Sequence, residues 1–159
     1  MTETHAKILF RYHSDILDEE VVETMWSEII DSEKGIYKLD NIPFYGPLIA
    51  RGDIFYAKYD ENEGGIVYKE TIAISGNSII QVVILKENFD KEIIREKLEL
   101  MDCLSEGLNE KYFVVEIKKD VDYAAVKHLL NEYYELEIID FAEPCLSKKH
   151  GDDLLKGFN

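Results

Sequence analysis

The stretch Tyr37-Lys-Leu-Asp-Asn-Ile-Pro-Phe-Tyr-Gly46, followed by Arg51-Gly52-Asp53, decides how the first half of the chain folds. Its first three residues alternate apolar and polar, which predicts the end of a half-buried strand. Asp40 and Asn41 favour a turn there, because their side chains accept hydrogen bonds from nearby backbone N–H groups. Pro43 fixes its own φ and keeps the preceding residue extended. The stretch therefore predicts a shaped crossing from one strand to the next.

Short alternations of apolar and polar residues flank this crossing on both sides. Residues 20–30 would also allow a helix, but their β-branched and aromatic content favours a strand. Turns rich in Asp, Glu and Gly separate the segments at the spacing of a small barrel. The predicted strands cover residues 6–12, 20–30, 36–39, 53–59 and 66–75. We therefore expect an antiparallel β-barrel-like domain over residues 5–76.

The second half has a different pattern. An apolar run over residues 78–85 predicts a central strand, and two segments with helical apolar spacing follow it, with Asn88 and Asp122 as their expected N-caps. Further strands are expected over residues 103–108, 112–118 and 136–141, the last one stopped by Pro144. This β-α-β-β-α-β order predicts a ferredoxin-like domain over residues 78–146 and an α+β fold for the chain. Residues 147–159 are expected to form a loosely ordered tail.

Acidic residues outnumber basic ones, 33 against 18, which gives a net charge of −15. Residues 1–76 carry 15 acidic and 7 basic residues and the remainder 18 and 11, so the halves have net charges of −8 and −7. Such a surface disfavours binding to nucleic acids and to anionic membranes. It attracts basic proteins, although an acidic surface also serves simply to keep a cytosolic protein soluble.

Cys103 and Cys145 lie far apart in the sequence and neither belongs to a CxxC motif, so we expect reduced, buried thiols instead of a disulfide or a zinc site. The N-terminal residues lack the basic and apolar segments of a secretory signal. No apolar stretch approaches the length that spans a bilayer. These features predict a cytoplasmic protein.

No catalytic signature occurs in the chain. Nucleophile-elbow, HExxH and phosphate-loop patterns are absent from the sequence. The four histidines follow no metal-ligand spacing; they are His5, His13, His128 and His150. For His128 we expect a partly exposed packing role. We expect no catalytic residues, no metal and no cofactor, and an enzyme with an unrecognised site stays as a third option.

Polar residues around the crossing suggest a small pocket between the two halves. The alternative is turn chemistry, with an Arg–Asp pair that holds the loop in place. The residues expected to line the pocket are Asp40, Asn41, Phe44, Arg51 and Asp53.

Acidic clusters at the predicted hairpin ends suggest a contact surface for a basic protein. The alternative is that they are solvated loop tips. The two clusters of the first half are Asp15, Asp18, Glu19, Glu20 and Glu23, and Asp60, Glu61 and Glu63. A third cluster in the second half, Glu132, Glu135 and Glu137, brackets Tyr133 and Tyr134.

Four segments carry a resemblance to a known family: Phe10-Arg-Tyr-His, Glu23-Thr-Met-Trp26, Tyr37-Lys-Leu-Asp-Asn-Ile-Pro-Phe44 and Gly52-Asp53-Ile-Phe-Tyr-Ala57. On these segments the chain resembles the bacterial family called domain of unknown function 4265, and the resemblance continues to about Cys145-Leu146. The family has no firmly assigned activity, so the resemblance implies no catalytic residues.

These observations predict a soluble, non-enzymatic, acidic protein-binding module with a basic protein partner. An immunity protein that neutralises a basic toxin, such as a nuclease, fits the size, the charge and the compartment, because carboxylates can occupy a cleft built for phosphates. The alternative is a small-molecule sensor with its ligand near Asp40, Phe44 and Arg51. The sequence leaves the oligomeric state open.

Overall fold

The computed structural model describes residues 3–14, 17–46 and 48–156. The chain divides into two compact units, Met1–Ser75 and Gly76–Asn159, each with its own hydrophobic core. Within the described residues, nine strands and three helices make a mixed α+β fold with one sheet in each unit. The units are described one at a time below.

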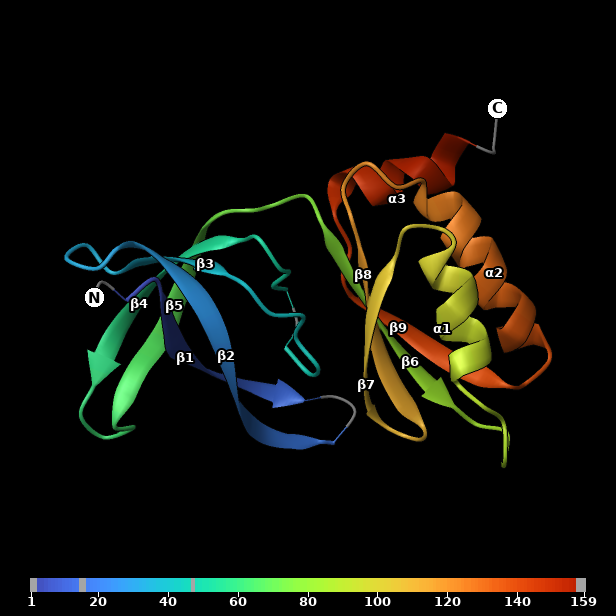
Figure 1. Ribbon diagram of the computed structural model, residues 1–159, viewed down its shortest axis with the longest axis horizontal. Coiled ribbons are helices and arrows are strands. Elements are labelled where there is room, and N and C mark those ends of the chain that lie inside the picture. The colour runs from blue at the N-terminus through green and yellow to red at the C-terminus, as the bar shows by residue number, and fades with distance from the viewer. Residues whose placement is uncertain (1–2, 15–16, 47, 157–159) are drawn as a thin grey trace. The chain divides into compact units, whose positions relative to one another are not determined.

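The first unit is built from five strands (Figure 1). Neighbours along the chain pair antiparallel, from β1–β2 to β4–β5, and β5 returns to β1 by a short parallel pairing that closes the barrel. The strands are β1 (His5–Ser14), β2 (Glu19–Asp31), β3 (Ile36–Leu39), β4 (Ile54–Asp60) and β5 (Gly65–Ala73). The segment of residues 20–30 is thus part of a strand, as the β-branched content predicted.

Alternation along the strands places one side chain in two inside the first unit. Phe10 and Phe55 meet edge to face with ring centroids 5.4 Å apart, and Phe10 stacks on Tyr68 at 5.1 Å. Such aromatic pairs stabilise a core beyond the area that they bury. The buried apolar residues of this core are Ile8, Phe10, Met25, Tyr37, Leu39, Ile49, Phe55 and Ala57.

The β2–β3 turn depends on one aspartate and one glycine. Asp31 Oδ1 accepts hydrogen bonds from the N–H groups of Glu33 and Lys34, both at 3.1 Å. Gly35 has a φ of 73°, and a Cβ at this position would lie 2.6 Å from the carbonyl oxygen of Ala57. Glycine is therefore required at the end of this turn.

The second unit follows the chain order β-α-β-β-α-β and then adds a helix. Its four strands lie in the order β7-β8-β6-β9, and all neighbours are antiparallel. The elements are β6 (Ser78–Ile84), α1 (Glu92–Glu99), β7 (Leu104–Asn109), β8 (Tyr112–Ile117), α2 (Tyr123–Glu135), β9 (Ile139–Cys145) and α3 (Lys148–Leu155).

Helices α1 and α2 lie on the same face of this sheet (Figure 1), where their apolar stripes join the strands in one core. The stripe of α2 is Val126, Leu130 and Tyr133, all buried. Asp122 caps α2 by accepting the N–H of Ala124 at 3.1 Å, which confirms that prediction. Asn88 does not cap α1: it has a φ of 62°, and the helix begins only after Lys91.

The expected loose tail is corrected over the described residues 147–156. These residues include α3, whose N-cap Ser147 accepts the N–H of His150 at 3.2 Å. His150 and Asp153 are buried, with 0% and 2% of their surface exposed. The hydrophilic composition of this segment suggested a loose tail, but His150 and Asp153 have hydrogen-bond partners inside the second unit.

Strand β9 also differs from its prediction, because it runs from Ile139 through Pro144 instead of ending before it. β9 is an edge strand of the sheet. Proline is tolerated at an edge, where its missing N–H leaves no neighbouring strand without a bond. The predicted first residues, 136–138, belong instead to the end of α2 and the turn that follows it.

Candidate functional site

The polar residues of the crossing are engaged in local bonds. Asp40 pairs with His5 at 3.0 Å and with Arg51 at 3.5 Å, and the side chain of Asn41 accepts the N–H of Trp26 at 2.5 Å. Buried Asp53 accepts the N–H of Ala50 at 3.0 Å and that of Ser75 at 2.8 Å. These bonds are of the kind that the turn interpretation expects, and the pocket around these residues stays a prediction.

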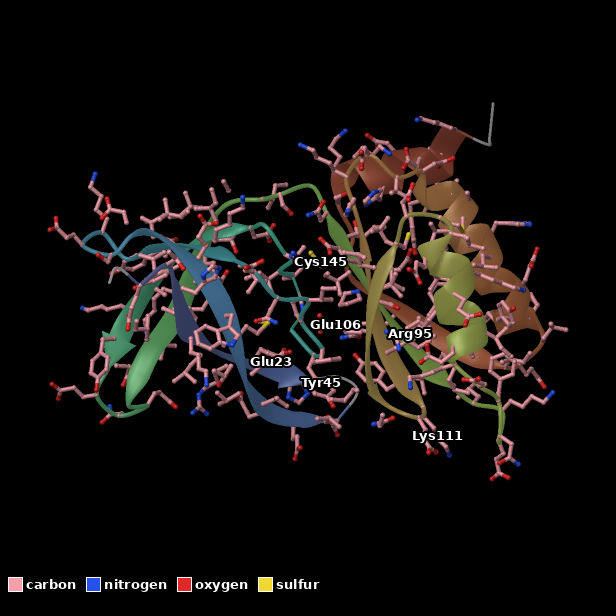
Figure 2. The ribbon with its side chains drawn as sticks, in the orientation of Figure 1. Glu23, Tyr45, Arg95, Glu106, Lys111 and Cys145 are labelled. Atoms are coloured by element: carbon pink, nitrogen blue, oxygen red, sulfur yellow. The ribbon has the colours of Figure 1, made fainter. Side chains whose placement is uncertain are left out.

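Glu23 is a structural residue of the same loop. Its carboxylate accepts the N–H groups of Phe44 at 2.7 Å, Tyr45 at 3.3 Å and Gly46 at 3.2 Å, and also the hydroxyl of Tyr12. Figure 2 shows Glu23 on β2 beside Tyr45 of the loop. Burial, together with the charge of Glu23, raises the pKa of Tyr45. The carboxylate is thus committed to holding the loop and is not spare surface charge.

The other predicted acids of the first unit fall into two groups. Asp18 pairs with His13 at 3.4 Å, Asp60 accepts the N–H groups of its own turn, and Glu63 bonds to Arg11. Asp15 lies outside the described residues. In the described structure, three exposed acids of these clusters make no side-chain hydrogen bond or ion pair: Glu19, Glu20 and Glu61.

Two acids of the third cluster, Glu135 and Glu137, line an open groove in the second unit, at the C-terminal end of α2. This acidic groove has a volume of about 430 Å3 and is lined by Leu85, Tyr134, Glu135, Glu137, Ile139 and Asp140. Pairing of β6 with β9 brings its parts together, because Ile84 lies opposite Ile139 and Val83 opposite Asp140. Of the predicted residues, Glu132 is elsewhere, paired with His128 at 3.2 Å, and Tyr133 faces the core.

The electrostatics of the acidic groove favour a cation. In the described part of the chain, no Lys, Arg or His pairs with Glu135, Glu137 or Asp140. The negative end of the helix dipole at the C-terminus of α2 adds partial negative charge. Tyr134 and Leu85 are about half exposed, at 48% and 56%, so apolar surface lies beside the carboxylates. A Lys or Arg side chain, with an apolar stem and a charged end, matches this combination.

A Schellman motif sets the backbone at the groove. Ile138 donates its N–H to Tyr133 O and Glu137 to Tyr134 O, both at 3.0 Å. Glu137 takes the left-handed conformation that this motif requires, with a φ of 61°. Two groove carboxylates could be found from the sequence, but Leu85 and Asp140 could not, since they join only through the sheet.

Sequence reasoning missed the buried bonds of His150. Its Nε2–H donates to the Lys118 carbonyl at 2.9 Å, so Nδ1 is an acceptor and receives the hydroxyl of Ser78 at 2.5 Å. Burial lowers the pKa of His150. Ser78 and His150 are both fully buried, which gives a substrate no access to the pair. The pair therefore ties α3 to β6 instead of forming a nucleophile.

The cysteines and the candidate metal ligands form no reactive site among the described residues. Burial raises the pKa of the Cys103 thiol to about 12, which keeps it protonated and inert. Cys145 forms no disulfide and is of intermediate burial. Among the described residues, His, Cys, Asp and Glu side chains form no group of three that could hold a metal ion. The described helices also include none that is long and apolar enough to cross a membrane.

Fold and site thus define an α+β chain of two units, a small closed sheet followed by a helix-covered antiparallel sheet with an acidic groove. The chain belongs to the family described as "Domain of unknown function (DUF4265)", whose model matches residues 23–141. This confirms the resemblance seen in the sequence.

A solved crystal structure shares the fold. It is a hypothetical protein from Neisseria gonorrhoeae, 23% identical, with a TM-score of 0.77 over 92% of this chain and 99% of that one. At this identity the likeness concerns the fold alone. No curated protein matches the chain.

Proposed function

We propose that the protein is a non-enzymatic, cytoplasmic binding module that holds a basic protein partner in its acidic groove. The observation that carries the proposal is the set of three carboxylates without a cation partner in the described structure, beside the half-exposed Tyr134 and Leu85. Like charges in one groove repel each other, and a bound Lys or Arg relieves that repulsion. Exposed tyrosine is enriched among the residues that dominate binding energy.

A basic toxin is the partner that best fits this proposal. An immunity protein must be acidic where a nuclease is basic, and it must associate quickly, which a net charge of −15 favours. The exposed acids Glu19, Glu20 and Glu61 of the first unit contribute to this steering. Their contribution falls as salt rises, since exposed charges are screened over about 8 Å at physiological salt.

The fold supports a binding module because the groove stands on rigid elements. We infer that the second unit is ferredoxin-like, since its four antiparallel strands and two helices follow the split-βαβ order. The groove lies where the end of α2 meets β9, so its geometry does not depend on a long loop.

Charge reversal in the groove tests the proposal. The variant E135K/E137K/D140K is compared with E96K/E99K/E110K, which makes the same change in net charge at three exposed acids of the same unit. The tagged wild-type protein first captures partners from its native lysate at low salt, and each captured basic protein is then purified. We expect the groove variant to weaken its binding at least tenfold and the control less than threefold.

Two results would contradict the proposal. Equal losses in the two variants would mean that net charge, and not the groove, attracts the partner. A partner whose binding is insensitive to salt and to both variants would not be held by carboxylates at all. In a separate titration with a short peptide of one arginine flanked by leucines, we expect NMR shifts at Leu85, Tyr134 and Asp140.

A further inference from the structure

A second cavity lies in the first unit, apart from every residue predicted to line a site. Its volume is about 180 Å3. This aromatic pocket is lined by Phe10, Arg11, Tyr12, Gly46, Leu48, Ile49 and Tyr68. It extends from Phe10, of which 3% is exposed, to Leu48 at the rim, of which 79% is exposed.

The pocket exists because the barrel is closed by only a short pairing between β1 and β5, which we call its seam. Strands β1 and β5 pair at only two positions in the described structure, Ile8 with Ile66 and Leu9 with Val67. Beyond Leu9 and Val67 the strands continue without pairing to each other, and their C-terminal ends are well separated in Figure 1. Phe10, Tyr12 and Tyr68, which follow the last pair, line the resulting space.

The loop of the crossing forms the other wall of the pocket. Gly46 and Ile49 belong to this loop, and Glu23 holds it by accepting the N–H groups of residues 44–46. Tyr12 lines the pocket and donates its hydroxyl to the same carboxylate. Glu23 is therefore a positioning residue, which joins the loop to the aromatic wall without lining the pocket.

Each polar side chain of the lining already has a partner. Arg11 bonds to Glu63, Tyr12 to Glu23, and the hydroxyl of Tyr68 to Thr71 at 2.6 Å. The charge of Arg11 is already balanced by Glu63, so a charged occupant would compete with Glu63 or lack a counter-ion in the lining, whereas an apolar occupant leaves all these bonds in place. Three of the seven lining residues carry aromatic rings, which pack well against another ring.

We propose that this pocket binds a small, uncharged aromatic molecule of one or two rings. Its volume is below the roughly 300 Å3 at which sites for drug-sized ligands begin. It is close to the roughly 150 Å3 of a dry apolar cavity that accepts benzene. The site is independent of the acidic groove, which shares no residue with it.

Titration of the full-length protein with indole, followed by NMR, tests the proposal. We expect saturable shifts of the ring signals of Phe10, Tyr12 and Tyr68, with the signals of Tyr134 unchanged. Indole-3-acetate and tryptamine, which add one negative and one positive charge to the same ring system, are expected to bind at least fivefold more weakly than indole. Tighter binding of either charged probe would overturn the assignment of an uncharged ligand.

Variants then locate the site. L48A removes part of the exposed rim and is expected to weaken indole binding about threefold to fivefold, while I74A, at a similarly exposed position outside the pocket, leaves it unchanged. Y68L removes a wall and is expected to weaken binding at least tenfold, with folding checked by the NMR spectrum. Absence of saturable shifts at the three rings, or equal effects of L48A and I74A, would overturn the proposal.

Discussion

At the residue scale, Glu23 shows how a position on a strand hides its role. Alternation along β2 and an acidic side chain placed it on a docking surface, yet its carboxylate accepts three backbone N–H groups and one hydroxyl. Those partners come from the loop of residues 44–46 and from Tyr12, so no local pattern in the sequence could have identified them.

Replacing Glu23 by Gln should therefore lower stability. The amide has one acceptor oxygen and no charge, so it cannot satisfy all the donors, and groups left without a partner cost about 1–3 kcal/mol. We expect E23Q to lower the free energy of unfolding by about that amount in urea denaturation. E28Q, at an exposed position of the same strand, is the matched control and should change it by less than about 0.5 kcal/mol. Equal effects would mean that Glu23 does not hold the loop.

At the element scale, the sequence predicted those helices and strands whose formation depends on residues close together in the chain. Alternation located the strands of the first unit, and Asp122 marked the start of α2 because a cap acts on its own first turn. Helix α3 escaped prediction because its burial depends on Ser78, Lys118 and Tyr123, which lie far away in the sequence. For the same reason the sequence predicted only part of the acidic groove: Leu85 and Asp140 are brought to it by the pairing of β6 with β9.

Two glycine substitutions at the end of α2 are expected to change the stability of the protein in opposite directions. Glu137 occupies a left-handed position that favours glycine, so E137G should stabilise the protein by about 0.5–1 kcal/mol. E135G, two residues earlier, places glycine in the last helical position and should destabilise it by about 1 kcal/mol. Both variants remove one groove charge, so the charge effect cancels in the comparison. Thermal unfolding measures both, and a shared sign would contradict the motif.

Docking of α3 should make stability depend on pH. Burial lowers the pKa of His150, although its bond to Lys118 O and the nearby charge of Asp153 oppose this, and Lys149 supports it. The stability that the buried, neutral His150 contributes is fully present above about pH 6.5, the ordinary pKa of an imidazole in the unfolded chain. It is lost as the pH falls from there toward the lowered pKa of His150 in the folded protein. Urea denaturation between about pH 7.5 and 5 measures the loss.

Variants at two histidines assign this pH dependence. H150Q has no imidazole to titrate, so its free energy of unfolding, although lower, should change less over this range. H128Q, at a side chain that is 80% exposed, should keep the wild-type profile. If H150Q loses stability with pH as steeply as the wild type, the buried imidazole is not the cause.

At the scale of the whole molecule, charge is the dominant feature. The net charge of −15 is divided almost evenly between the two halves of the sequence, so repulsion acts throughout the molecule. Salt screens such repulsion, and we expect raising NaCl from about 0.02 to 0.3 M at pH 7.5 to increase the midpoint of thermal unfolding by a few degrees. Near the isoelectric point of about 4.6 the increase should vanish. A similar increase at both pH values would point to a general salting-out effect.

The seam between β1 and β5 also bears on how the protein is made. Ile8 and Ile66 are separated by 58 positions (66 minus 8), so the pairing that closes the first unit is its most distant in sequence. Such contacts form slowly, because a long loop must be closed first. On the ribosome, β1 waits with one edge unpaired until β5 has emerged. An unpaired edge invites pairing with other chains, and this interval is when the nascent chain most needs protection from aggregation.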